Sequence, residues 1–256
     1  MAFIDLKYYS AVLGMQTEAA VILPQQDTQG QIGVENNTRP GPYKCLYLLH
    51  GLSDDHTIWM RRTAIERYAS QYGIAVVMPR ADKSFYTDMK YGMKYYTHIA
   101  KELPALICQL FNVSEKREDN YIAGLSMGGY GALKIGLREC KRFCKAAGLS
   151  PCGDMRAMVG TGGFEDVMFP IFGEDYYVPD SDDLLTLCDL RKDDPDCPKL
   201  FVAIGTEDFL YENCRTFKKK LEDCGIDHTW REGPGAHSWD YWDEQIKHVL
   251  WWMFRE

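Results

Sequence analysis

The sequence predicts an α/β fold in which a mostly parallel central sheet carries helices on both of its faces. Short β-branched or aliphatic runs alternate along the chain with longer amphipathic segments, the pattern expected when helices connect parallel strands. The 256 residues suffice for one large core, and no Ser-, Gly- or Pro-rich linker or shift in composition divides them. We therefore expect a single domain over residues 1–256, with an insertion at about 151–198.

Strands are expected where a short apolar run lies between turn residues. The first two should form an antiparallel pair at one edge of the sheet, with Gly14 in the turn between them. The predicted strands cover residues 3–9, 18–23, 45–49, 74–78, 121–125, 146–149, 200–204 and 228–231.

Helices fit between most of these strands, at residues 57–70, 95–111, 127–138, 211–224 and 239–254. Pro104 should kink the second helix, because proline lacks the amide hydrogen that an α-helix needs at that position. Residues 25–41, rich in Gln, Asn, Gly and Pro, predict an exposed loop. Residues 151–198 are rich in Gly, Asp and aromatic residues, so we expect an insertion near the functional site rather than another β–α unit.

Residues 124–128 read Gly-Leu-Ser-Met-Gly and match the pattern G-x-S-x-G. An apolar run precedes this motif and a helix-like segment begins at Met127, so Ser126 should occupy a sharp strand-to-helix turn. Such a turn forces unusual dihedral angles on the serine, and the small residues Gly124 and Gly128 allow it to close without clashes. The pattern therefore predicts Ser126 as an exposed nucleophile.

A serine hydroxyl is a weak nucleophile at neutral pH and needs a general base, most often a neutral imidazole. Of the six histidines, His237 is the best placed, in a loop after the last strand and before the C-terminal helix. From such a loop a side chain can reach the carboxyl ends of the strands. His228 lies within a strand pattern and His248 on the final helix, so His237 is predicted as the base.

The acid that orients the imidazole should follow a strand between the nucleophile and the histidine. Asp208 follows such an apolar run, and the order Ser126, Asp208, His237 matches the order Ser, Asp or Glu, His that accompanies this kind of turn. Glu207 is the main rival for the role. Asp240 is a weaker rival, because it opens the last helix and is suited to interact with the helix dipole.

Acyl transfer also needs hydrogen-bond donors for the oxyanion of the tetrahedral intermediate, commonly two main-chain amides. One should be the amide of Met127, the residue after the predicted nucleophile. The other should be the amide of Leu52, which follows His50 and Gly51 at the end of a strand, where the glycine permits close approach of the backbone.

The overall charge argues against nucleic acid as a partner, since the formal net charge is −8 and the sequence pI is about 5.3. The basic run 218–220 is interpreted as a solvated helix face. The N-terminal residues lack the pattern of a secretory signal, and no apolar run is long enough to span a bilayer. We therefore expect a soluble, cytoplasmic protein without a membrane partner.

The nine cysteines include no C-x-x-C pair and are spread over predicted strands and helices, so they are expected to be reduced thiols. Cys140 and Cys144 have no matching Cys/His pair nearby, and a zinc site is not expected.

Taken in order, these motifs resemble the esterase D-like branch of the α/β-hydrolases, and most of all the bacterial tributyrin and acetyl esterases, with feruloyl esterases as close relatives. The similarity runs from the N-terminal strand pair through Leu-Leu-His-Gly-Leu-Ser-Asp-Asp-His-Thr-Ile-Trp at 48–59 to the final helix. It implies a serine carboxylesterase that cleaves short acyl esters through a Ser–His–Asp triad and an acyl-enzyme. It also implies a small-molecule or oligosaccharide ester as substrate, with no cofactor and no metal.

Other functions stay open. In the S-formylglutathione hydrolases of this branch a Thr-Cys pair typically follows His-Gly-Leu, whereas Ser53 and Asp54 follow here, and residues 79–88 lack the expected tryptophan. An acyltransferase would use the same acyl-enzyme, and a non-catalytic binding module on the same fold would predict a broken triad. The sequence leaves the oligomeric state open, with a homo-oligomer as one alternative.

Aromatic residues near the predicted site are candidates for lining the substrate pocket. We expect contacts with substrate from Trp59 on the first helix, from Tyr91 and Tyr95 before the kinked helix, and from Phe172 in the insertion. Phe164, Phe169 and Tyr176 of the insertion are further candidates.

Overall fold

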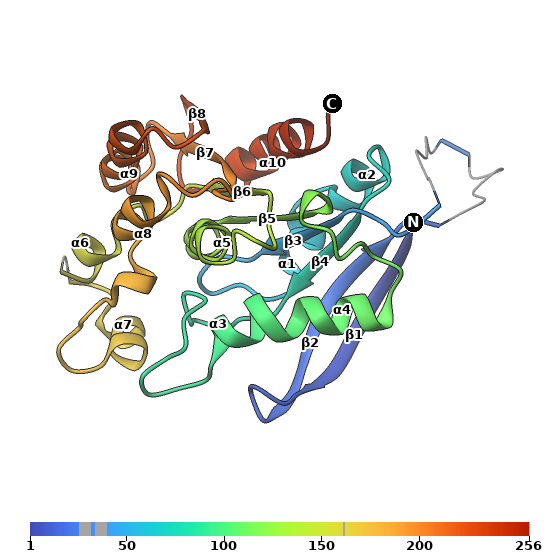
Figure 1. Cartoon of the computed structure of the whole chain (residues 1–256), viewed down its shortest axis with the longest axis horizontal. Coiled ribbons are helices and arrows are strands. Elements are labelled where there is room, and N and C mark those ends of the chain that lie inside the picture. The colour runs from blue at the N-terminus through green and yellow to red at the C-terminus, as the bar shows by residue number, and fades with distance from the viewer. Residues whose placement is uncertain (26–31, 34–39, 161, 256) are drawn as a thin grey trace.

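An eight-stranded sheet runs through the computed structural model, which describes residues 1–25, 32–33, 40–160 and 162–255 (Figure 1). The strand order is β1-β2-β4-β3-β5-β6-β7-β8. The strands are β1 (Ala2–Ser10), β2 (Met15–Leu23), β3 (Cys45–Leu49), β4 (Ala75–Pro79), β5 (Asn120–Leu125), β6 (Lys145–Leu149), β7 (Lys199–Gly205) and β8 (His228–Gly233).

Most of the sheet is parallel, because β4, β3, β5, β6, β7 and β8 pair in parallel with their neighbours. The antiparallel hairpin β1–β2 forms one edge and joins the rest through antiparallel pairing of β2 with β4. The predicted α/β class and the antiparallel edge pair are therefore confirmed. The predicted loop at 25–41 lies largely outside the described residues.

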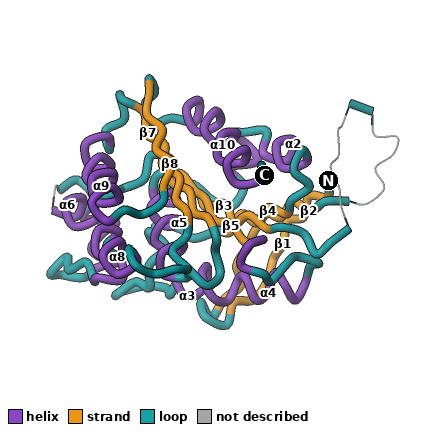
Figure 2. Tube along the Cα trace, turned by 45° about the horizontal axis from the view of Figure 1, so that its top comes forward, coloured by secondary structure: helices purple, strands orange, loops and turns teal. Residues whose placement is uncertain are grey.

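Helices cover both faces of the sheet, as Figure 2 shows for α2 and α10 on one side and α3, α4 and α5 on the other. The helices are α1 (Ile58–Arg62), α2 (Ile65–Ser70), α3 (Tyr95–Thr97), α4 (Leu103–Leu110), α5 (Met127–Arg138), α6 (Met155–Gly160), α7 (Glu165–Phe172), α8 (Leu184–Arg191), α9 (Tyr211–Cys224) and α10 (Trp239–Phe254). Among the described residues, no helix is both long and apolar enough to cross a membrane.

The helix predicted over 57–70 is in fact two helices, α1 and α2. Thr63 takes an extended conformation between them, with φ −136° and ψ 174°. Its hydroxyl donates to the Trp59 carbonyl at 2.6 Å and accepts from the Ile65 amide at 3.1 Å. The threonine side chain thus ends one helix and begins the next, a competition with backbone hydrogen bonds that apolar periodicity does not register.

The helix predicted over 95–111 carries a wider π-helical turn at His98–Glu102 between α3 and α4. Pro104 lies in the first turn of α4, where its missing amide hydrogen costs least. The irregularity expected at this proline therefore takes the form of an extra residue in the preceding turn.

The segment 151–198 connects the parallel strands β6 and β7, so it must contain a crossover. Its helix α8 packs against α5 and α9 and serves as the crossover helix. The expectation that this segment lacks a β–α unit is wrong for α8. The helices α6 and α7 lie at the periphery of the fold (Figure 1), and Met158 on α6 reaches the pocket described below.

Candidate active site

Ser126 lies between β5 and α5 with φ 51° and ψ −118°, a conformation that serine rarely adopts. Backbone packs closely on both sides of it. A Cβ atom on Gly124 would lie 2.3 Å from the Gly128 carbonyl oxygen, and one on Gly128 would lie 2.5 Å from that of His50. The two glycines are therefore required for a turn that presents the serine side chain at the carboxyl ends of the strands.

Ser126, His237 and Asp208 form one hydrogen-bonded chain. Nε2 of His237 lies 2.8 Å from the Ser126 hydroxyl oxygen, and Nδ1 lies 2.9 Å and 3.0 Å from the two Asp208 carboxylate oxygens. Because a carboxylate only accepts, Nδ1 of the neutral ring carries the hydrogen. Nε2 then has a free lone pair for the serine proton, which is the arrangement that a general base needs.

The Asp208 carboxylate is buried and held from two sides. One oxygen accepts from the Leu210 amide at 2.9 Å, and both face His237. Burial alone raises the pKa of Asp208, but the hydrogen bonds from His237 and from Leu210 outweigh it, so the net pKa lies below the usual value. Asp208 is therefore suited to stay charged and to stabilise a protonated His237.

Glu207, the main rival, binds elsewhere. Its carboxylate accepts from the Gly235 amide at 2.5 Å and from the Thr206 hydroxyl at 2.8 Å. It thereby ties down the loop that leads to His237 without touching the imidazole. Asp240, the weaker rival, lies exposed in the first turn of α10.

The residues predicted to supply the oxyanion donors, Met127 and Leu52, both lie beside Ser126. Met127 is the first residue of α5, so its amide has no acceptor within the helix. Leu52 lines the cavity beside Ser126, in the turn 51–54, which is closed by a hydrogen bond from the Asp54 amide to the Gly51 carbonyl and is called the oxyanion turn below. A Cβ atom on Gly51 would lie 3.7 Å from the Ser126 Cβ atom, so this turn approaches the serine closely.

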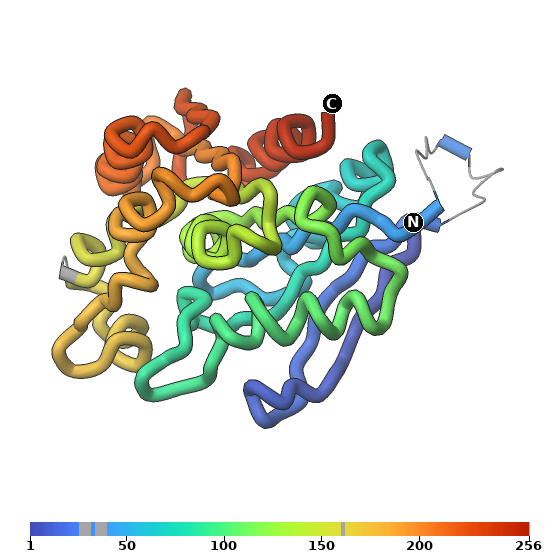
Figure 3. The backbone as a smooth tube through the Cα atoms, in the orientation of Figure 1, coloured from blue at the N-terminus to red at the C-terminus, as the bar shows by residue number. Residues whose placement is uncertain are grey.

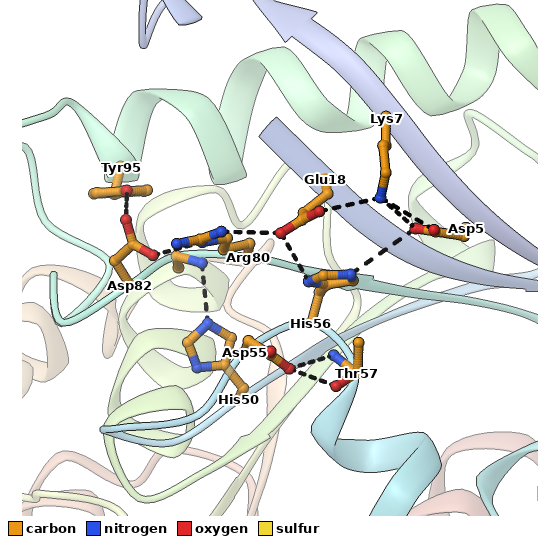
Figure 4. Close-up of polar contacts among 11 residues, drawn as sticks. Asp5, Lys7, Glu18, His50, Asp55, His56, Thr57, Arg80, Asp82 and Tyr95 are labelled. Atoms are coloured by element: carbon orange, nitrogen blue, oxygen red, sulfur yellow. Dashed lines mark hydrogen bonds and ion pairs between the residues drawn. The ribbon is translucent and has the colours of Figure 1, made fainter. Parts of the chain in front are cut away.

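His50 precedes the same turn, and the close-up in Figure 4 shows its ring beside the residues that follow β3 and β4. Its Nε2 accepts from the Ala81 amide at 3.0 Å, and Nδ1 donates to the Gly51 carbonyl at 2.8 Å. Burial lowers the pKa of His50, in keeping with a neutral ring. Tyr86 donates to the His50 carbonyl at 2.9 Å. In the sequence His50 is recognisable only as the end of a strand, and no local pattern marks Tyr86.

A charged network beside His50 joins the β1–β2 hairpin to the residues that follow β3 and β4 (Figure 4). Arg80 donates to Glu18 at 2.9 Å and to Asp82 at 2.7 Å, and His56 lies 3.7 Å from Glu18. Each exposed pair contributes little alone, but together they link the hairpin to segments next to the oxyanion turn.

A cavity of about 340 Å³ opens beside Ser126 and His237. Its lining is mainly apolar and comes from the oxyanion turn, the loop after β4, α6, the residues after β7 and the start of α10. Besides Ser126 and His237 it includes Gly51, Leu52, Ser53, Asp54, Phe85, Leu125, Met158, Phe164, Phe209, Leu210, Trp239 and Trp242.

Most of these pocket residues were not predicted from the sequence, although Phe164 is one of the further candidates named there. Trp239 and Trp242 come two and five residues after His237, on the first turns of α10, and that spacing was a usable signal. Trp242 stands edge-on to the His237 ring with ring centres 4.9 Å apart, and it donates to the Ser150 hydroxyl at 3.0 Å.

Trp59 and Phe172, which were predicted to contact substrate, are not among the described residues that line the cavity. Trp59 is buried beneath the pocket, where its indole donates to the Leu49 carbonyl at 3.0 Å and its ring packs edge-on against Trp239. Phe172 is buried in the apolar core beneath α7. Both rings face inward because they lie on the buried sides of their helices.

Tyr91 and Tyr95, the other two predicted contacts, do not line the cavity either. Tyr91 lies half exposed against Phe169, away from the residues that line the cavity. Tyr95 donates to Asp82 and belongs to the polar network near the β1–β2 hairpin (Figure 4).

Comparisons with known proteins place the chain in a family. Residues 10–253 match the family described as "Putative esterase". The chain is 30% identical to an acetyl esterase of Caldicellulosiruptor saccharolyticus, over 99% of this chain and 98% of that protein.

Two solved structures from Staphylococcus aureus are similar along almost the whole chain. The fluorophosphonate-binding serine hydrolase FphF is 37% identical, with a TM-score of 0.88, over 100% of this chain and 99% of that one. The S-formylglutathione hydrolase FrmB is 38% identical, with a TM-score of 0.86, over 99% of each chain. The fold is thus that of the α/β-hydrolases, and the chain belongs to the putative esterase family as a carboxylic ester hydrolase.

Proposed function

We propose that the protein hydrolyses short-chain acyl esters with Ser126 as nucleophile, His237 as general base and Asp208 as the acid that orients it. The observation that carries this proposal is the hydrogen-bonded chain Ser126–His237–Asp208 at the mouth of an apolar cavity. The similarity to an acetyl esterase supports the choice of a short acyl group.

In the proposed reaction, Ser126 attacks the ester carbonyl while His237 takes its proton. The amides of Leu52 and Met127 hold the oxyanion of the tetrahedral intermediate. His237 then protonates the departing alcohol, and the acyl group remains on the serine. Water enters, loses a proton to the same imidazole and releases the acid, which restores the free serine.

The leaving group is proposed to be a neutral alcohol, such as a sugar hydroxyl of an acetylated oligosaccharide. The described residues that line the cavity include no Lys or Arg, and Asp54 is the one acidic residue among them. Burial raises the pKa of Asp54, with Asp55 adding to the effect. A leaving group with carboxylates of its own gains no cationic partner there.

The second candidate is hydrolysis of S-formylglutathione, which the 38% identity to FrmB favours. Glutathione carries two carboxylates, so this activity would need basic residues that the cavity lining does not supply. A thioester substrate is otherwise compatible with the same acyl-enzyme route.

A substrate panel separates these candidates. The kcat/KM values of p-nitrophenyl acetate, butyrate and octanoate, of acetylated xylo-oligosaccharides, of a feruloyl ester and of S-formylglutathione should be compared, with Ser126→Ala as the control. The proposal expects the acetyl and butyryl esters to lead. S-formylglutathione leading by a wide margin would replace it with the second candidate, and sugar acylation without release of free acid would indicate a transferase.

A cytoplasmic location remains a prediction that rests on the nine free cysteines. Independence from metal and cofactor, and the absence of nucleic-acid or membrane partners, are proposals of the same kind.

A further inference from the structure

A lysine is fully buried behind the nucleophile. Lys134 lies on α5, eight residues after Ser126, and its side chain has no exposed surface. Its ammonium group donates to the Phe85 carbonyl at 3.1 Å, to the Thr87 hydroxyl at 2.7 Å and to Asp182 at 2.8 Å. An ammonium group has three hydrogens, so all of its donors are used.

Two of these acceptors lie in residues 85–87, the segment called the Phe85 wall below because Phe85 lines the pocket. Phe85 lines the cavity, and Phe85 and Tyr86 have φ of 47° and 53°, in the left-handed region that bulky aromatic residues avoid. Backbone in that conformation persists only when its surroundings hold it there. Lys134 and Thr87 both donate to the Phe85 carbonyl and so supply part of that hold.

The same wall is tied to the oxyanion turn. The Tyr86 ring packs so closely on α5 that a Cβ atom on Gly131 would lie 2.4 Å from it. From there its hydroxyl reaches the His50 carbonyl, two residues before Leu52. A displacement of residues 85–87 would therefore change both the shape of the cavity and the position of the oxyanion turn.

The third acceptor lies in the segment that closes the other side of the cavity. Asp182 belongs to the connection between β6 and β7 that also supplies Met158 and Phe164 to the lining. Tyr130, one turn before Lys134, donates to the Asp182 carbonyl, and its ring lies 4.8 Å from the ammonium group. Arg138 also contacts the Asp182 carboxylate, at 3.4 Å.

A buried ion pair is weak evidence for stability, because desolvation offsets most of the attraction. Here, however, one cation joins the helix of the nucleophile, the Phe85 wall and the segment that carries Met158 and Phe164. The three hydrogen bonds of the Lys134 ammonium group fix where its acceptors lie relative to α5. An apolar side chain of the same size would not, because apolar contacts have no preferred direction.

We propose that Lys134 is a positioning residue that holds the Phe85 wall of the pocket and thereby limits the length of the acyl group accepted. The inference rests on the proposed esterase function. Without the ammonium group, the strained backbone at residues 85–87 relaxes and the pocket admits additional methylene groups.

The test compares Lys134→Met with the wild type and with Lys145→Met. Lys145 on β6 is a matched control, because it is partly buried and donates to the carbonyls of Trp252 and Met253, at 2.9 Å each, far from the cavity lining. The readout is the ratio of kcat/KM for p-nitrophenyl hexanoate to that for p-nitrophenyl acetate. This ratio should rise by about fourfold for each methylene newly accommodated in Lys134→Met, and it should not change in Lys145→Met.

An unchanged ratio in folded Lys134→Met overturns the inference. If Lys134→Met does not accumulate as folded protein, Thr87→Val replaces it in the test. That variant removes the hydroxyl acceptor in residues 85–87 and keeps the ion pair of Lys134 with Asp182. An unchanged ratio of kcat/KM values in Thr87→Val also overturns the inference. Labelling rates with short and long alkyl fluorophosphonates give a parallel ratio that needs no turnover. If neither the wild type nor the variants hydrolyse esters, the proposed function is rejected. The positioning role of Lys134 would still stand if Lys134→Met altered the ratio of labelling rates for long and short alkyl fluorophosphonates.

Discussion

Glu207 and Asp208 are adjacent in the sequence, yet their carboxylates hold different parts of one loop. Asp208 binds the His237 ring, whereas Glu207 binds the Gly235 amide two residues before that histidine. The orientation of the His237 ring and the support of the loop are thus divided between neighbouring side chains.

This division predicts different outcomes for two conservative changes. Asp208→Asn should lower kcat by as much as about 10⁴, because the amide no longer selects the tautomer that leaves Nε2 free. Glu207→Gln should lower kcat far less and should mainly lower the melting temperature, since it weakens the bond to the Gly235 amide. Steady-state kinetics and thermal unfolding of both variants check this. A larger kcat loss in Glu207→Gln at unchanged stability would assign the acid to Glu207.

Ser126 should be the residue that a fluorophosphonate probe labels. The strained turn, the 2.8 Å contact with His237 Nε2 and the adjacent amides converge on this hydroxyl alone among the serines of the cavity lining. Intact-mass and peptide mass spectrometry locate the adduct. Undiminished labelling of Ser126→Ala, with Ser53→Ala as control, would contradict the assignment.

Short acyl chains should be preferred over long ones. A methylene that enters an apolar pocket gains only about 0.8 kcal/mol, so a closed wall easily reverses the trend. We expect kcat/KM for acetyl and butyryl esters to exceed that for an octanoyl ester. The opposite order would show that the cavity is open on the acyl side.

Asp54→Asn should raise kcat/KM for S-formylglutathione severalfold and change that for a neutral acetate ester little. The substitution keeps the shape of the side chain and removes a negative charge from the pocket lining. Equal effects on both substrates would mean that Asp54 acts through the geometry of the oxyanion turn and not through its charge.

Lys134 should leave a signature in the dependence of stability on pH. Burial lowers its pKa from the usual 10.5 to about 8, against the opposing effect of Asp182, with Arg138 and Asp88 as the other charges that act on it. At pH values between these two pKa values, Lys134 is more protonated in the unfolded chain than in the folded one, so it makes the free energy of unfolding rise with pH. Below about pH 8 both states hold the proton and the contribution is flat.

Urea unfolding at a series of pH values checks this sign. From pH 8 to 10 the slope of the unfolding free energy against pH should be more positive in the wild type than in Lys134→Met. Identical slopes would mean that the folded protein does not perturb the lysine.

The sequence located the strands, most helices and the residues Ser126, Asp208 and His237 because these depend on local patterns and on chain order. The serine motif lies at a strand-to-helix junction, and the acid and the histidine follow strands whose carboxyl ends meet. Pocket residues depend instead on which side of a helix faces the cavity. Trp59 was predicted to line the pocket but lies buried outside the lining, because a buried helix face and a pocket face have the same composition.

Lys134 illustrates a second limit. A lone lysine within an apolar helix pattern reads as an exposed charge, since burial of an ammonium group depends on acceptors that come from residues 85–87 and 182, distant in the sequence. The break at Thr63 has a similar cause, because a single side-chain hydrogen bond decides it. Neither feature changes the apolar periodicity from which elements are predicted.

The edge-on contact between Trp242 and His237 has a spectroscopic consequence. An indole ring whose centre lies 4.9 Å from an imidazole senses the charge on that ring, and the same indole is anchored to the Ser150 hydroxyl. In the proposed reaction the imidazole gains and loses a proton in each half-reaction. The emission of Trp242 should therefore respond to the charge on the His237 ring, a readout that needs no coloured product.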